Sequence, residues 1–516
     1  YESMTYTKSK SIFLKLAALV FIALFCIMVF SSPVRAEETS AAELTPDITL
    51  SNQGSVSRMT DGSYNTKTSF SAGDTIHVTS SEKMYSLYIK WDLIPDEWTL
   101  TYNGKTETFG TNGFLHEYID IPEGTSEMTI TFASGEAICD MHVYSQGQAP
   151  ADVQTWKTPC DKADILVFAT HADDEILFLG GVLATYGGEQ NLAVQVAYMC
   201  EFSSSAKIRE HEKLDGLWES GIKHYPVCGD FPDLYSQTLE AAKKQYVYDD
   251  VKSYATSCIR RFKPFVVVTQ DLNGEYGHGG HMLFSHAVAE SVETSNDSSV
   301  FPESASNYGT WDVPKTYLHL YTENKITMNL RLPLSRMGNR TSIEVQTAAY
   351  KKHVSQQWCW FYVSDDYEYS CADFGLYRTT VGNDTGNDML ENIQPYLNEG
   401  ETIYVGKVDS LTASSGRNRI LLKGLYIYGV TQKKCVIRWQ SQGEEDKSLE
   451  LDVVRENTID PFEVMINDLE EGQYEFSITT YDAKGNSSIE SVIEGYAYGD
   501  FYEGNLVNRK MDRLYT

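Results

Sequence analysis

The stretch ADILVFATHADDEILFLGG, residues 163–181, decides the fold of the central part of this chain. Its first eight residues form a short apolar run that is typical of a buried strand, and the part from HADDE onward predicts a loop entering a helix. Carboxylates crowded together repel one another and lose hydration free energy when they leave water. A divalent cation held at this point would neutralise Asp173, Asp174 and Glu175, and so would explain why they precede an apolar segment.

Strand-like and helix-like segments alternate after this stretch. LAVQVAYMC, PFVVVTQD and TYLHLYT are short strand patterns, whereas KIREHEKLDGLWESG and HMLFSHAVAESVET are predicted helices. The alternation predicts an α/β, Rossmann-like domain over residues 157–385, with a mostly parallel sheet covered on both faces. Such sheets bind ligands beyond the carboxyl ends of their strands, which is where HADDE falls.

A second polar cluster follows another predicted strand. PFVVVTQD leads into LNGEYGHGGHMLFSH, where His278 and His281 are expected on a glycine-rich loop. If neighbouring strands carry both loops, His171, Asp174 and His281 converge into a three-ligand site with one open position, which suits zinc. The same ligands suit non-haem Fe(II). Either motif alone could be a solvated helix cap or a flexible loop, but their occurrence together favours a metal site.

The adjacent carboxylates are expected to have different roles. Asp174 can ligate the cation, which leaves Asp173 outside the coordination sphere and free to accept a proton from an activated water. Glu175 is expected to favour the N-terminus of the following helix rather than to take part in chemistry.

The motifs also resemble a known family. HADDE with GG five residues on, then RxxE, then D-x-x-G-x-Y-G-H-x-x-H is similar to the PIG-L, or LmbE-like, family of zinc-dependent N-deacetylases, over residues 163–381. The resemblance implies one zinc per chain, bound by His171, Asp174 and His281, and Asp173 as the general base.

Further roles follow from the same resemblance. It implies that His278 steadies the oxyanion or protonates the departing amine, that Tyr276 reaches the substrate carbonyl and that Arg209 binds substrate. KKHVSQQ, with His353 and Gln356, resembles the late H-x-S-Q segment of the family.

Two positions depart from the family pattern. Ala172 stands where the family usually has proline, and Gly280 stands where an aspartate often supports the first histidine of His-Pro-Asp-His. Either Glu275 or Asp271 replaces that aspartate, or His278 is less basic than its family counterpart.

The flanking regions predict two all-β sandwich domains. Residues 41–150 alternate apolar and polar positions between turn signals, and TDGSYNTKTSF weakly resembles galactose-binding, discoidin-like domains. Trp91 and Trp98 could stack on a sugar there, although filling the core is the favoured interpretation. Residues 400–516 resemble a fibronectin type III module, chiefly through YEFSITTYDAKGNSS.

The N-terminus predicts export. Three lysines precede the apolar run at residues 16–30, and SSPVRA provides a signal-peptide cleavage site after Ala36, although an uncleaved anchor is the alternative. With Cys26 removed, eight scattered cysteines remain without CxxC spacing, which argues against a disulfide scaffold and a cysteine zinc site. Cys200 and Cys258 are expected to be core thiols.

Composition and motifs together predict a secreted or cell-surface zinc hydrolase that deacetylates an N-acetylated amino sugar. The net charge of −30 makes nucleic acid and anionic membranes poor partners, and no stable membrane span is expected after cleavage. Two alternatives stay open: a non-enzymatic glycan-binding surface protein with a relic metal site, and a zinc amidase or esterase that acts on another substrate.

Overall fold

The computed structural model describes residues 40–393, 405–426, 432–441, 447–455, 459–483, 487–488 and 490–504. The expected signal peptide, residues 1–36, lies outside the described residues. The described part of the chain divides into two compact units, one formed by residues 40–91, 96–111 and 117–153, and the other by the remaining described residues. Within the described part of the chain, no helix is both long and apolar enough to cross a membrane.

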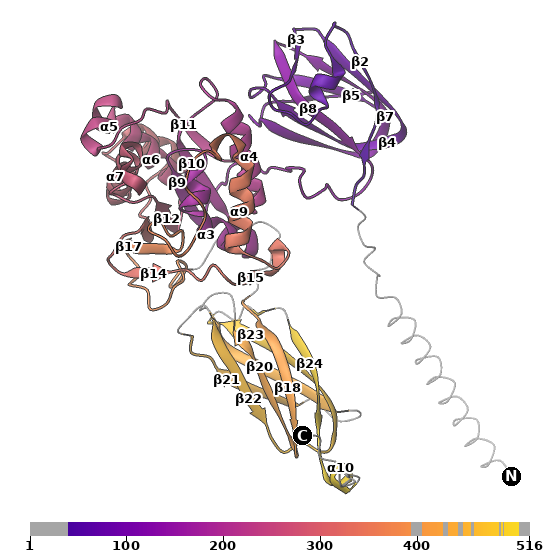
Figure 1. Ribbon diagram of the computed structural model, residues 1–516, viewed down its shortest axis with the longest axis vertical. Coiled ribbons are helices and arrows are strands. Elements are labelled where there is room, and N and C mark those ends of the chain that lie inside the picture. The colour runs from indigo at the N-terminus through magenta and orange to yellow at the C-terminus, as the bar shows by residue number, and fades with distance from the viewer. Residues whose placement is uncertain are drawn as a thin grey trace, which may run out of the picture. The chain divides into compact units, whose positions relative to one another are not determined.

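The N-terminal unit is built from strands. They are β1 (Glu43–Leu44), β2 (Asp47–Leu50), β3 (Thr68–Phe70), β4 (Thr75–Trp91), β5 (Trp98–Tyr102), β6 (Lys105–Phe109), β7 (His116–Phe132) and β8 (Glu136–Tyr144). Hydrogen bonds join them in the order β1-β8-β4-β7-β5-β6, with β2 paired to β4 and β3 paired to β8. Figure 1 shows these strands wrapped around a shared interior.

The interior of this unit settles the role of its tryptophans. Trp91 and Trp98 are fully buried, and both indole nitrogens donate to Glu117 Oε2, at 3.2 and 3.0 Å. They therefore fill the core and offer no face to a sugar. Asn103 and Gly104 form the hairpin turn between β5 and β6, and both residues adopt the positive φ that such a turn needs.

The central region contains the predicted α/β sheet. Its strands run in the order β11-β10-β9-β12-β13-β17-β14. The bounds are β9 (Ile165–Ala169), β10 (Val194–Cys200), β11 (Val227–Phe231), β12 (Val266–Thr269), β13 (Lys315–His319), β14 (Lys325–Thr327) and β17 (Asp373–Thr379). Strands β11 to β13 pair in parallel, whereas β17 pairs antiparallel with both β13 and β14.

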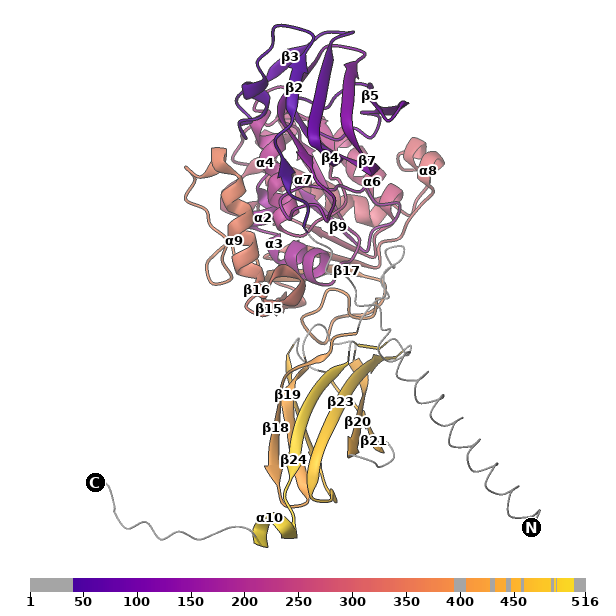
Figure 2. The ribbon, with the colours of Figure 1, turned by 90° about the vertical axis from the view of Figure 1, so that its right-hand side faces the viewer.

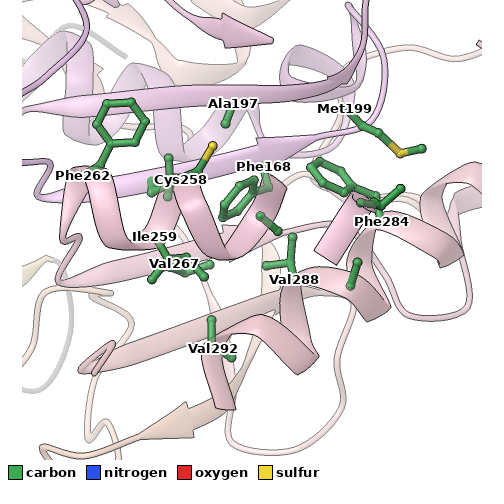
Figure 3. Packing of buried hydrophobic residues seen from close by; sticks show 14 of the residues in the cluster. Phe168, Ala197, Met199, Cys258, Ile259, Phe262, Val267, Phe284, Val288 and Val292 are labelled. Carbon is green, nitrogen blue, oxygen red and sulfur yellow. The ribbon is translucent and has the colours of Figure 1, made fainter. Parts of the chain in front are cut away.

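Helices cover both faces of this sheet. Figure 1 shows α6 (Tyr248–Phe262) and α7 (Gly279–Thr294) on one side of β9 and β10, and α4 (Ile208–Glu219) and α9 (Ser342–Lys352) on the other. Figure 3 shows the core between sheet and helices, where Phe168 and Val267 meet Ile259, Phe284 and Val288. Because β9 and β12 are buried on both faces, they are continuous apolar runs.

Shorter elements complete this region. They are α2 (Asp174–Leu177), α3 (Gly180–Val182), a π-helical turn η2 (Leu183–Glu189), α5 (Leu239–Gln245), η3 (Glu275–Gly277), α8 (Pro302–Tyr308), β15 (Pro333–Leu334), η4 (Ser335–Met337), β16 (Arg340–Thr341) and η5 (Val354–Gln356). The helix expected after HADDE is thus interrupted. The expected core thiols are confirmed, since Cys200 and Cys258 are buried, and none of the eight described cysteines forms a disulfide.

The described part of the C-terminal region consists of strands and one short helix. Its elements are β18 (Val408–Gly416), β19 (Arg419–Tyr426), β20 (Gln432–Ser441), β21 (Lys447–Asp452), β22 (Asp460–Ile466), β23 (Gly472–Asp482), β24 (Ser491–Ala497) and α10 (Asp500–Gly504). One sheet has the order β18-β19-β22 and the other β21-β20-β23-β24. Figure 2 shows these strands side by side, and their buried residues form one hydrophobic cluster. The middle of the predicted DAKGNSS turn, residues 484–486, lies outside the described residues.

Candidate metal centre and active site

The site lies where the chain order of the sheet reverses. Strand β9 sits between β10, which follows it in the chain, and β12, which comes after β11. Loops leaving β9 and β12 therefore meet at the carboxyl edge, where open α/β sheets bind ligands. Gln270 ties the two loops together: its Oε1 accepts from Thr170 N at 2.8 Å, and its Nε2 donates to Glu275 Oε2 at 3.2 Å.

The three predicted metal ligands converge. His171 Nδ1 lies 3.0 Å from Asp174 Oδ2, His281 Nε2 lies 3.1 Å from the same oxygen, and the two ring nitrogens are 3.2 Å apart. Ligand atoms of a tetrahedral zinc ion, each about 2.0–2.1 Å from the metal, lie roughly 3.3 Å from one another. The buried His171, Asp174 and His281 therefore fit a small divalent cation with almost no movement.

Both histidine ligands have an outer carboxylate. His281 Nδ1 lies 2.7 Å from Glu275 Oε2, and His171 Nε2 lies 3.2 Å from Asp233 Oδ1. Carboxylates in this position fix the ring orientation of metal-binding histidines and make them better ligands. Glu275 is itself held by His319, whose Nδ1 is 2.6 Å from Glu275 Oε1 and whose Nε2 faces the Ser370 carbonyl oxygen at 2.9 Å.

Charge within the cluster favours the ionised carboxylates. Burial alone would raise the pKa of Asp174, but the facing imidazoles of His281 and His171 hold it well below its usual range. Burial likewise opposes ionisation of Glu275, yet hydrogen bonds from His281 and His319 lower its pKa to about 2. Both carboxyl groups are therefore ionised, and a cation can bind at the centre without first displacing a proton from either of them.

His281 does not lie on a loop, as the glycines suggested. It lies in the first turn of α7, because the His278 side chain caps that helix by accepting from Gly280 N at 3.1 Å. The cap begins the helix at Gly279 and turns the His281 ring toward His171. A helical position is more rigid than a loop position, which suits a metal ligand.

The structure also decides between the alternatives for His278. Glu275 bonds to His281 and His319, and the Asp271 side chain accepts from Asn273, so neither hydrogen bond is directed at His278. Burial and the neighbouring imidazoles lower the pKa of His278 to about 3. The second alternative therefore holds: no carboxylate replaces the missing aspartate, and His278 is a neutral, less basic group at the edge of the metal site.

Asp173 stands beside the ligand set in a strained backbone conformation. Its φ of 132° is rarely adopted by L-residues, and such strain persists only where the surroundings enforce it. Glu175 Oε2 accepts from Asp173 N at 2.9 Å, and Arg209 Nη2 lies 3.2 Å from Asp173 Oδ1. Burial raises the pKa of Asp173, Arg209 lowers it, and the balance is about 7.

Arg209 is fixed at this edge of the site. Its guanidinium lies over the Phe202 ring, 4.0 Å from the centroid, and Nη2 donates to the Ala172 carbonyl oxygen at 2.7 Å. Its side chain is only 12% exposed. The arrangement directs Arg209 at Asp173, while the substrate-binding role suggested by the resemblance stays a prediction.

Tyr276 lies at the mouth of the site. Its ring is 5.3 Å from that of His281 and 5.6 Å from that of His278, measured between centroids. The side chain is partly exposed, and burial raises its pKa above the ordinary value, so the phenol stays protonated and can donate. Its position is compatible with the expected role toward a substrate carbonyl.

The late H-x-S-Q segment packs behind the site. His353 is buried, with Nε2 3.8 Å from Glu175 Oε1, and burial lowers its pKa to about 3. Glu212 anchors the same segment by accepting from Ser355 N at 2.7 Å. Gln356 donates to Ser355 Oγ at 2.9 Å, so it stabilises the segment.

Sequence reasoning missed Asp233, His319 and Gln270 as parts of this site. Asp233 follows strand β11, His319 is the last residue of strand β13, and Gln270 directly follows strand β12. Polar residues at strand ends were the available signal, but no local motif marked these three.

Fold and site together define a class: an α/β domain with a two-histidine, one-aspartate centre and an adjacent carboxylate suited to a general base. Residues 166–292 match the PIG-L family, described as GlcNAc-PI de-N-acetylase. This match of residues 166–292 confirms the resemblance seen in the sequence. Residues 386–515 match a second family, described only as a domain of unknown function.

Curated relatives match the central region at low identity. A 1D-myo-inositol 2-acetamido-2-deoxy-alpha-D-glucopyranoside deacetylase 1 from Catenulispora acidiphila is 23% identical over 185 residues, which are 31% of this chain and 56% of that protein. The corresponding deacetylase from Rhodococcus erythropolis is 25% identical over 178 residues, 30% of this chain and 59% of that protein. The chain thus spans little more than half the length of these relatives.

One similar solved structure is an N,N'-diacetylchitobiose deacetylase from Pyrococcus horikoshii. It is 18% identical, with a TM-score of 0.30, and the alignment covers 38% of this chain and 72% of that chain.

Proposed function

We propose that this protein is a zinc-dependent N-deacetylase that hydrolyses the acetamide of an N-acetylated amino sugar in a GlcNAc-type glycan or glycoconjugate and releases acetate. The carrying observation is the convergence of His171, Asp174 and His281, within 3.0–3.2 Å of one another, beside Asp173. The match of residues 166–292 to the PIG-L family and the deacetylase activities of the similar proteins support the same chemistry.

The residues divide the reaction between them. A zinc ion bound by the three ligands would supply Lewis-acid polarisation of the amide carbonyl and would acidify a water molecule. Asp173, as carboxylate, accepts the proton of the attacking water. Tyr276 donates a hydrogen bond to the substrate oxygen as negative charge develops on it, and neutral His278 contributes a second polar contact at the same edge. Asp173 then passes the proton it accepted to the amide nitrogen as the C–N bond breaks, which releases the amine and leaves acetate.

The wider organisation is also part of the proposal. We class the sheet-bearing region, residues 157–385, as Rossmann-like and the regions at residues 41–150 and 400–516 as accessory sandwich modules. Glycan binding by the N-terminal module stays a proposal, and Trp91 and Trp98 take no part in it because they are buried. Export to the outside of the cell, with cleavage after Ala36, rests on the sequence of residues 1–36 alone.

Acetate release tests this function. The full chain is incubated with a panel of N-acetylhexosamine glycans, with and without a chelator, and acetate is quantified. Release that stops with chelator and returns with zinc supports the proposal, and recovery with iron instead reassigns the metal. Glycan binding without any acetate would favour the non-enzymatic alternative. Acetate release from unrelated amides or esters, but not from the glycans, would favour the alternative of a zinc amidase or esterase that acts on another substrate.

A further inference from the structure

An exposed aromatic surface borders the candidate active site. We call it the aromatic rim and define it as Tyr276, Trp358, Trp360, Phe361 and Tyr362. The two tryptophans are 81% and 60% exposed, in chain order. Large apolar side chains gathered on a surface in this way mark binding sites, whereas single exposed ones do not.

Ring contacts connect the rim to the metal ligands. The Tyr276 ring centroid lies 5.3 Å from that of His281, the Phe361 centroid lies 4.4 Å from that of Tyr276, and the Trp360 centroid lies 4.1 Å from that of Phe361. Two aromatic contacts thus lead from Tyr276 at the site's mouth to the exposed indole of Trp360. A ligand with one end at the metal centre and the other on Trp360 would follow this path.

The segment that carries the rim is held on both sides. Before it, Ser355 N donates to Glu212 Oε1 at 2.7 Å. After it, Cys371 N donates to the Ser364 carbonyl oxygen at 2.9 Å, and Arg331 Nε donates to Asp365 Oδ2, also at 2.9 Å. A segment with fixed ends loses less conformational freedom when a ligand arrives. These contacts fix both ends of the segment that carries the four rim residues other than Tyr276.

Charge selects the kind of ligand. Residues 354–370 contain Asp365, Asp366 and Glu368 but no lysine or arginine. Anionic membranes and nucleic acids are bound by basic residues, so this surface suits neither of them. A neutral sugar fits better, because the axial C–H bonds of a pyranose form an apolar face that can lie on an aromatic ring. Arg331 already pairs with Asp365, so the carboxylates of this surface are partly neutralised.

We propose that the aromatic rim forms sugar-binding subsites, so that the protein acts on a chain of N-acetylhexosamine units rather than on a single sugar. The unit to be deacetylated occupies the metal centre, and neighbouring units of the chain stack on Phe361 and Trp360. The deacetylation part of this inference rests on the proposed function, whereas the sugar-binding part rests on the aromatic rim alone.

The test compares Trp360→Ala with wild type, using N-acetylglucosamine and its β-1,4-linked tetramer. We expect kcat/KM for the tetramer to fall roughly tenfold and that for the monomer to stay unchanged, because one ring contact of this kind is worth about that much. Trp360→Phe should recover most of the loss. Tyr308→Ala is the matched control, because Tyr308 is an exposed aromatic residue on α8 and not part of the rim.

Binding measured separately keeps this inference distinct from the proposed function. Calorimetric titration of the tetramer into chelator-treated full chain should give a dissociation constant that Trp360→Ala raises by the same factor. If this binding is seen but no acetate is released after zinc is restored, the proposed activity is wrong, whereas the proposed sugar binding by the rim still holds. If Trp360→Ala and Trp358→Ala both bind the tetramer as tightly as wild type, the rim is not a sugar-binding surface. Tryptophan-dependent binding to lipid vesicles in place of the sugar would also contradict the proposal.

Discussion

Glu275 Oε2 lies 2.7 Å from Nδ1 of His281, and its other oxygen lies 2.6 Å from Nδ1 of His319. The carboxylate therefore joins the end of strand β13 to the first turn of helix α7, and it fixes the ring of a metal ligand from behind. Because hydrogen bonds from these histidines lower the pKa of Glu275 to about 2 against the effect of burial, the carboxylate is charged near neutral pH.

Glu275→Gln should weaken metal binding about 10- to 100-fold, which is the usual effect of removing an outer carboxylate. A glutamine keeps the size but loses the charge that makes His281 a strong ligand. Zinc affinity is measured by competition with a chromophoric chelator. Asp271→Asn, four residues away and bonded to Asn273, is the control and should bind zinc like wild type. Unchanged affinity in Glu275→Gln would contradict the assignment.

Asp173→Asn and Asp174→Asn should fail in different ways. Asp173→Asn keeps its zinc but loses about 10²- to 10⁴-fold in kcat, because asparagine cannot accept the proton of water. Asp174→Asn instead loses zinc affinity, since a neutral amide oxygen replaces an anionic ligand. Metal content and kcat measured on both variants separate the two roles. Zinc lost from Asp173→Asn and kept by Asp174→Asn would reverse them.

Arg209→Gln should move the acid limb of the pH–rate profile to higher pH. The base works as a carboxylate, so kcat/KM falls as pH drops through the pKa of Asp173. Burial raises that pKa to about 7 against the opposing effect of Arg209, and a bound cation lowers it, so the wild-type limb lies at or below pH 7. Removing Arg209 raises the pKa. If Arg209 only binds substrate, KM rises and the limb stays where it is.

Asp173→Gly should be more stable than Asp173→Ala. Both lack the carboxylate, but only glycine adopts the φ of 132° without strain, and strain of this kind costs about 1–3 kcal/mol. Urea unfolding of the central region measures the difference. The pair Ser253→Gly and Ser253→Ala, within helix α6, is the control and should show the opposite order by about 1 kcal/mol. Equal stability of the two Asp173 variants would show that the site holds no such strain.

The sequence alone predicted the central α/β region and its three candidate ligands. Short apolar runs alternating with helical patterns are typical of strands that are buried on both faces, and HADDE and HGGH each follow such a run. Parallel strands place their carboxyl ends at one edge, so His171, Asp174 and His281 had to approach one another once β9 and β12 were neighbours. Periodicity and position along the chain are enough for conclusions of this kind.

The tertiary structure alone decided which side chains support those ligands. Glu275 lies three residues from His278 in the chain, yet it bonds to His281 and His319, because the helix cap at His278 turns His281 inward. Asp233 reaches His171 from another strand, which no local motif marks. The burial of Trp91 and Trp98 was likewise fixed by packing, since an alternating strand pattern shows that two faces exist but not which aromatic rings the core encloses.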